Sequence, residues 1–131
     1  MANSLYPKGA EKILSGAIDL TTDTIKAVLV KDSYTYSSAH EFLSDLSTHP
    51  VGTAMTLGSP TVTGGYFDAS DLTFTAVPSA TVESLVLYKD TGSGATSPLL
   101  AYFDSSPLPI ASNGGDLGVT WNASGIFRII L

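Results

Sequence analysis

Residues 82–103 read VESLVLYKDTGSGATSPLLAYF, and this stretch decides the fold class of the chain. It joins an apolar run at 82–88 to a second apolar run at 99–103 through a segment rich in Gly, Ser, Asp and Thr. Short runs of β-forming residues separated by such turn formers are typical of neighbouring β-strands. The runs at 119–121 and 126–131 repeat the pattern, and the apolar end of the sequence, 129–131, predicts a strand tied into a sheet. The C-terminal part therefore predicts a compact antiparallel β-structure.

The preceding residues extend the same pattern toward the N-terminus. Residues 25–30 are a β-branched run that predicts a core strand, and apolar residues alternate with Thr at 72–76. Residues 61–63 and 66–67 flank Gly64-Gly65, which predicts a turn between two strands. With about eight strands and no long linker, residues 1–131 predict one mainly β domain with an antiparallel β-sandwich or jelly-roll-like architecture.

Two short helices are expected beside the strands. Residues 7–14 begin with Pro7, a favoured first helical residue, and Gly16 can end the helix; Ala10, Ile13 and Leu14 are predicted to share its apolar face. Residues 38–46 contain Ser38 followed by a glutamate three positions later, the pattern of a capping box. An apolar stripe at Phe42, Leu43 and Leu46 predicts that this second helix packs on the sheet.

Composition limits the classes of partner. Six basic and twelve acidic residues give a net charge of −6, which disfavours binding to nucleic acids and to anionic membranes. Charged residues are only 14% of the chain and cysteine is absent, so we expect a neutral, hydroxyl-rich surface and no disulfide or thiolate metal site. Hydroxyl groups cost less to desolvate than charges, so such a surface suits packing against another protein. Residues 1–6 have no basic or strongly apolar stretch, and no signal peptide is expected.

The residues that commonly carry catalysis do not form a recognisable motif. His40 and His49 lie nine positions apart, outside any nucleophile-elbow or zinc-binding pattern, and packing or solvated roles are expected for both. Residues 92–97 are Gly- and Ser-rich but lack the lysine and following helix of a phosphate-binding loop, so we expect a loop between strands. Catalytic, cofactor-binding and metal-binding residues are predicted to be none. Glutamates that meet only in space remain an open alternative, and the candidates are Glu11, Glu41 and Glu83.

Three further features have alternative interpretations. Asp19 with Asp23, and Asp68 with Asp71, flank turns where they either bind Ca²⁺ weakly or, as we expect, hydrogen-bond the local backbone. Trp121 is expected in the core, with stacking on a sugar as the alternative. Residues 122–125 predict a turn and contain a glycosylation sequon that matters only in a secretory pathway.

Nine segments spread over nearly the whole chain form a familiar series: 6–9 (YPKG), 18–20 (IDL), 25–30 (IKAVLV), 40–46 (HEFLSDL), 67–76 (FDASDLTFTA), 87–92 (LYKDTG), 98–104 (PLLAYFD), 113–116 (NGGD) and 126–127 (IF). In these segments the chain resembles a family of small virion structural proteins from tailed bacteriophages. The resemblance implies a non-enzymatic structural role, best fitted by a capsid decoration or cement protein on the outer head surface. Most of these segments are expected core strands and turns, so the resemblance assigns no site residues.

The implied role brings its own expectations. The partner would be the major capsid protein, the location would be the virion, and the protein would act as a homo-oligomer, by analogy a trimer. Residues 2–6 are expected to form an N-terminal arm that lies on a neighbour, together with hydroxyl-rich loops at 35–37 and 93–95. The alternatives are a tail or baseplate adaptor and a glycan- or receptor-binding module.

Overall fold

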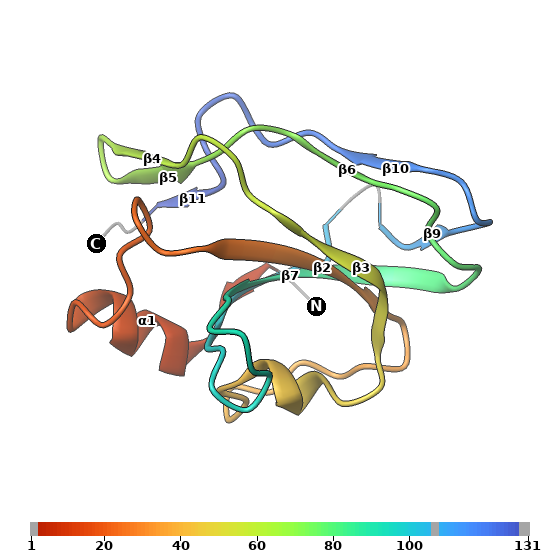
Figure 1. Cartoon of the computed structure of the whole chain (residues 1–131), viewed down its shortest axis with the longest axis horizontal. Helices are drawn as coiled ribbons and strands as arrows, with labels where there is room; N and C mark the ends of the chain where they lie inside the picture. The colour runs from red at the N-terminus through yellow and green to blue at the C-terminus, as the bar shows by residue number, and fades with distance from the viewer. Residues whose placement is uncertain (1–2, 106–107, 129–131) are drawn as a thin grey trace.

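The computed structural model describes residues 3–105 and 108–128, which form antiparallel sheets and one α-helix (Figure 1). The elements, in chain order, are β1 (Ser4–Leu5), α1 (Pro7–Leu14), β2 (Ile25–Lys31), the 3-10 helix η1 (Leu43–Leu46), β3 (Pro50–Thr56), β4 (Thr61–Thr63), β5 (Tyr66–Asp68), β6 (Leu72–Phe74), β7 (Thr81–Lys89), β8 (Leu99–Phe103), β9 (Ile110–Ala111), β10 (Leu117–Val119) and β11 (Phe127–Arg128).

The largest sheet has the strand order β1-β8-β7-β2-β3, and β9 pairs with the beginning of β7. Two smaller sheets, β10-β6 and β11-β5-β4, lie over one face of this sheet, and α1 and η1 lie on the other side (Figure 1). All of these pairings are antiparallel. The predicted mainly β, antiparallel, sandwich-like fold is therefore confirmed.

The central strands β2 and β7 are buried on both faces. Leu85 and Leu87 of β7 pack into the main core toward the smaller sheets, whereas Val86 and Tyr88 pack into a second core on the opposite face. Successive side chains of a strand point to opposite faces, so a strand covered on both sides requires apolar residues at every position. This double burial explains why residues 85–88 form an unbroken apolar run.

Helix α1 has the predicted bounds. Pro7 occupies the first turn and Gly16, with φ of +82°, follows the C-terminal cap. The apolar face is wrong in one position, because Leu14 is 75% exposed while Gly9, which the pattern gave no role, is buried against β8. No helix in the described part of the chain has the length and apolar content needed to cross a membrane.

The predicted helix at residues 38–46 is wrong, and only η1 is helical there. The Leu43 N–H donates to the Ser97 carbonyl at 2.8 Å, and the Leu99 N–H donates to the Glu41 carbonyl at 2.8 Å. These backbone groups pair with the start of β8 and are therefore not available to a helix. The Glu41 side chain was expected to take part in a capping box with Ser38. Its carboxylate instead lies 2.7 Å from the Lys12 amino group.

Several strand boundaries also differ from the prediction, and the structure shows eleven strands in its described residues. The alternation at 72–76 ends early because Ala76 has φ of +47° and is exposed. The strand predicted at 119–121 is shifted to β10, so Trp121 follows it. Strand β11 lies within the run predicted at 126–131, but residues 129–131 lie outside the described residues.

The expected N-terminal arm is wrong for residues 4–6. Strand β1 pairs with Ala101 and Tyr102 of β8, and the Tyr6 N–H donates to the Leu100 carbonyl at 2.9 Å. The Tyr6 side chain is fully buried. This segment is therefore part of the sheet; residues 1 and 2 lie outside the described part of the chain.

Candidate binding surfaces

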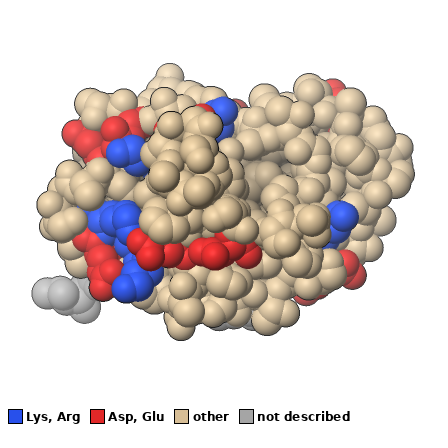
Figure 2. All heavy atoms as spheres, turned by 60° about the horizontal axis from the view of Figure 1, so that its bottom comes forward, with Lys and Arg blue, Asp and Glu red and all other residues tan. Residues whose placement is uncertain are grey.

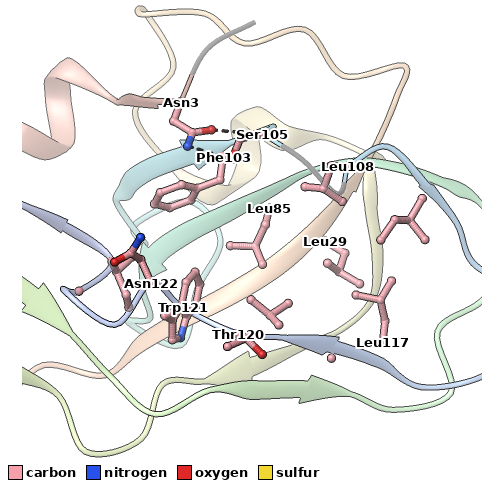
Figure 3. A pocket seen from close by; sticks show the side chains of 15 residues that line it. Asn3, Leu29, Leu85, Phe103, Ser105, Leu108, Leu117, Thr120, Trp121 and Asn122 are labelled. Carbon is pink, nitrogen blue, oxygen red and sulfur yellow. Dashed lines mark hydrogen bonds between the residues drawn. The ribbon is translucent and has the colours of Figure 1, made fainter.

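A cleft of about 630 Å³ opens between the large sheet and β10, and we refer to it as the interlayer cleft (Figure 3). Leu29, Leu85 and Phe103 line it from the large sheet, and Leu117 and Val119 line it from β10. The remaining lining includes Asn3, Ser105, Leu108, Ile110, Thr120, Trp121, Asn122 and Ile126. The walls are thus largely apolar, with a few amide and hydroxyl groups.

Trp121 forms one side of the interlayer cleft. Its Nε1–H donates to the Ser70 carbonyl at 3.1 Å, and its ring centroid lies 6.2 Å from that of Phe103. The side chain is half-buried and packs against the main core. The prediction that Trp121 lies in the core is therefore confirmed only in part. The adjacent turn is confirmed, because the Gly125 N–H donates to the Asn122 carbonyl at 2.9 Å.

A hydrogen-bonded network of tyrosines and a histidine lies on the opposite face of the large sheet. The hydroxyls of Tyr6 and Tyr34 are 3.0 Å apart, and the Tyr34 hydroxyl lies 2.7 Å from Nδ1 of His40. The Tyr36 hydroxyl donates to the Leu5 carbonyl at 2.9 Å. The network joins the segment after β2 to the N-terminal strand, and it gives the buried hydroxyls of Tyr6 and Tyr34 a partner.

The network makes stability sensitive to alkaline pH. Burial, reinforced by the Tyr34 hydrogen bond, raises the pKa of Tyr6 well above its usual value of 10.0. Burial also raises the pKa of Tyr34. Because the folded state holds these phenol protons more tightly than the unfolded state, the associated stability is complete below pH 10 and is lost as the pH rises above it.

Tyr6→Phe is therefore expected to make the alkaline loss of stability less steep. At pH 8 the variant should lose about 1 kcal/mol, because the bond to Tyr34 is removed. Above pH 10 its free energy of unfolding should fall less steeply than that of the wild type. Urea unfolding at several pH values between 8 and 11 measures both effects, and equal slopes for the two proteins would contradict the assignment.

The histidines considered for catalysis serve in packing. Nδ1 of His49 lies 2.8 Å from the Leu46 carbonyl oxygen, and the rings of His40 and His49 both contact Tyr34 at centroid distances of 5.5 and 5.8 Å. Both side chains are half-buried. Of the packing or solvated roles expected from the sequence, the contacts of both histidines correspond to packing.

Asp19, Asp23 and Asp68 accept hydrogen bonds from the local backbone, as expected, whereas Asp71 accepts one from a distant segment. Asp19 accepts from the Thr21 N–H at 2.9 Å, and its hydrogen bonds to Thr21 lower the pKa of this carboxyl. Asp68 accepts from the following N–H at 2.8 Å, and Asp71 accepts from the Trp121 N–H at 2.9 Å. Within residues 3–105 and 108–128, no three His, Asp or Glu side chains are grouped to hold a metal ion.

The remaining candidates for chemistry lie in separate contacts. Glu11 lies 3.7 Å from Lys8, Glu41 pairs with Lys12, and Glu83 lies on β7. Residues 92–97 form part of the loop between the paired strands β7 and β8, as predicted, and the Ser97 hydroxyl donates to the Ser93 carbonyl at 2.7 Å.

Charged side chains are unevenly distributed over the surface. Ion pairs between charged groups 2.7 to 3.7 Å apart join α1, the turn after it and the ends of β2 and β7: Lys8–Glu11, Lys12–Glu41, Lys26–Asp90 and Lys89–Asp23. In the face shown in Figure 2, most red and blue spheres gather on the left and centre, and the right part is largely uncharged. The molecule therefore has a charged end around α1.

The part of the chain from β3 to β6 differs from this end. Residues 50–75 contain only two charged residues, Asp68 and Asp71. We call the exposed residues of 50–75 the β3–β6 surface. Its exposed hydroxyl side chains are those of Thr53, Thr56, Ser59, Thr61, Thr63, Ser70, Thr73 and Thr75. This part of the chain thus combines exposed hydroxyl groups with very little charge, as composition led us to expect of the surface.

Strand β4 gives the β3–β6 surface an open edge. It pairs with β5 on one side and is the outer strand of its sheet in the described residues. All three of its residues are exposed, and Val62 is 52% exposed. Edge strands are usually protected by charges, prolines or bulges, because their free N–H and C=O groups can pair with another chain. Here Pro60 precedes the strand, but the strand itself carries no charge.

Local sequence patterns do not reveal the interlayer cleft or the tyrosine network. Leu117 and Val119 alternate with a glycine, which is a weak sign of a half-buried strand, but nothing local shows that the layer below them is open. Tyr34 and Tyr36 also alternate, yet their meeting with Tyr6 and Tyr102 depends on strand pairing.

In comparisons with known proteins, no family model matches the chain, and no curated protein is significantly similar to it.

Proposed function

We propose that the protein is a non-enzymatic structural component of a tailed-phage virion that binds the outside of the head and stabilises the shell. Its partner in this proposal is the major capsid protein, and it acts as a homo-oligomer, by analogy a trimer. The observation that carries the proposal is the β3–β6 surface, which is hydroxyl-rich and almost uncharged and includes the open edge of β4. The resemblance of nearly the whole chain to small phage virion proteins supports the same role.

The physical basis is the low cost of covering such a surface. Contact with a shell removes water from both partners, and hydroxyl groups lose less on desolvation than charges do. Exposed backbone groups of β4 offer hydrogen bonds to an extended segment of the partner. A shell presents the same site many times, so linked copies hold on to it by multivalency even where one contact is modest.

The two other roles considered for the chain differ from this one in measurable ways. A tail or baseplate adaptor would be present in few copies per particle. A glycan-binding module would need an aromatic ring free to stack on a sugar, whereas Trp121 is half-buried and packs beside Phe103. We therefore favour the head-binding role, and copy number distinguishes it from the tail role.

Quantitative mass spectrometry of purified particles is the direct test, and we expect hundreds of copies per particle. Val62→Lys should reduce occupancy of the shell at least tenfold, because it places a charge on the open β4 edge. Leu14→Lys is the matched control, since Leu14 is 75% exposed but lies on α1 at the charged end. It should bind like the wild type.

Six or twelve copies per particle would favour the tail role, and particles without the protein would refute a virion role. Equal occupancy for the wild type and Val62→Lys would show that the β4 edge is not part of the contact. Loss of binding in both variants, with their folds intact, would likewise contradict the assignment of the contact to the β3–β6 surface.

A further inference from the structure

The interlayer cleft has the size and lining of a site for a small apolar ligand. Its volume of about 630 Å³ falls within the range of roughly 300 to 1,000 Å³ that is usual for ligand pockets. Leu85 and Leu29 line it on the large sheet, and Leu117 faces them from β10 (Figure 3). Val119, on the same strand, also lines the cleft. None of the lining residues within the described part of the chain is charged.

The cleft is held open by contacts at both ends of β10. The Ala76 N–H donates to the Asp116 carboxylate at 3.0 Å, just before β10, and the Trp121 N–H donates to the Asp71 carboxylate at 2.9 Å, just after it. Between these points β10 pairs with β6. These bonds fix β10 to the outer layer, so the strand does not move toward the large sheet independently of β6.

The rim of the cleft is held in a similar way. The Asn3 side-chain oxygen accepts from the N–H groups of Asp104 and Ser105 at 2.9 and 3.2 Å, and this joins the segment before β1 to the segment after β8. The Trp121 Nε1–H already has its partner in the Ser70 carbonyl. The Asn3 side-chain oxygen and the Trp121 Nε1–H are thus engaged with the protein, and most of the other side chains that line the cleft are apolar.

We propose that the interlayer cleft binds a small uncharged apolar molecule, such as an aromatic hydrocarbon or a short alkyl chain. Water in an apolar space lacks hydrogen-bond partners, whereas an apolar molecule gains contacts with the walls. A charged ligand would lose its hydration without gaining a partner there. Because the walls are already in place, little ordering of the protein opposes binding. This inference is independent of the proposed role in the virion.

The single tryptophan of the chain gives a direct assay. The neutral fluorophore N-phenyl-1-naphthylamine should bind the full-length protein, and its emission should rise while Trp121 emission falls through energy transfer. Val119→Phe extends a side chain into the cleft and should weaken binding at least tenfold. Val62→Phe makes the same substitution on the exposed β4 edge, outside the cleft, and should bind like the wild type.

A second measurement uses the wild type alone and does not depend on the folding of a variant. Methyl resonances of Leu29, Leu85, Leu117 and Val119 should shift when benzene or the fluorophore is added, while those of Leu14 and Val62 should not. Absence of binding, shifts outside the lining, or equal binding by a folded Val119→Phe variant would overturn the proposal.

Discussion

Leu87→Ala is expected to lower the free energy of unfolding by about 3 to 5 kcal/mol and the melting temperature by roughly 10 to 20 °C. Leu87 is fully buried in the main core at the centre of β7. Its neighbours in the sheet are Ala27 on β2 and Ala101 on β8, both buried. The substitution would therefore place three alanines side by side, and the small neighbours have no atoms that can move into the space. For this reason we expect a cost in the upper part of the usual range for Leu→Ala.

Leu14→Ala is the matched control for this prediction. It removes the same atoms from a side chain that is 75% exposed, so the change should be within about 0.5 kcal/mol. Chemical denaturation of the three proteins gives both values. If Leu87→Ala cost less than about 1 kcal/mol, the position of β7 between β2 and β8 would be in doubt.

Gly9→Ala is expected to destabilise the protein by about 2 kcal/mol or more, although alanine is the better helix former. A Cβ atom at position 9 would overlap the Leu99 carbonyl oxygen and would lie 3.0 Å from the Leu100 Cα atom. Both belong to the backbone of β8 and cannot turn aside as a flexible side chain would. The overlap outweighs the gain of about 1 kcal/mol in helix propensity, so α1 has to shift away from the sheet.

Gly118→Ala provides the comparison, because an added Cβ atom there meets nothing within 4 Å and the backbone does not have a positive φ. Its free energy of unfolding should stay within about 0.5 kcal/mol of the wild type. Thermal unfolding followed by circular dichroism compares the variants. A Gly9→Ala variant as stable as the wild type would show that α1 does not approach β8 this closely.

These two sites show how far local sequence patterns predict the structure. The apolar run around Leu87 predicts a core strand, and the structure confirms it in β7. Glycine disfavours helices, yet the helix that contains Gly9 forms with its predicted bounds. The glycine at position 9 is explained by the close approach of α1 to β8, ninety residues further along the chain, and no local sequence pattern predicts this contact.

The helix predicted at residues 38–46 shows the opposite effect. Its spacing of serine, glutamate and apolar residues is typical of a short helix, but a helix of two turns has little stability of its own. Pairing of Glu41 and Leu43 with the start of β8 supplies backbone hydrogen bonds from a distant segment. Tertiary contacts therefore override the local preference, and only η1 stays helical.

By itself the sequence determined the mainly β class, most of the principal strands, helix α1 and the neutral, hydroxyl-rich character of the chain, because these follow from side-chain periodicity, turn residues and composition. Only the tertiary structure decided the pairing order of the strands, the interlayer cleft, the tyrosine network and the open edge of β4. The reason is that each of these depends on which distant segments meet. Strand register and layer spacing are set by the packing of the whole chain, and short windows of residues do not encode them.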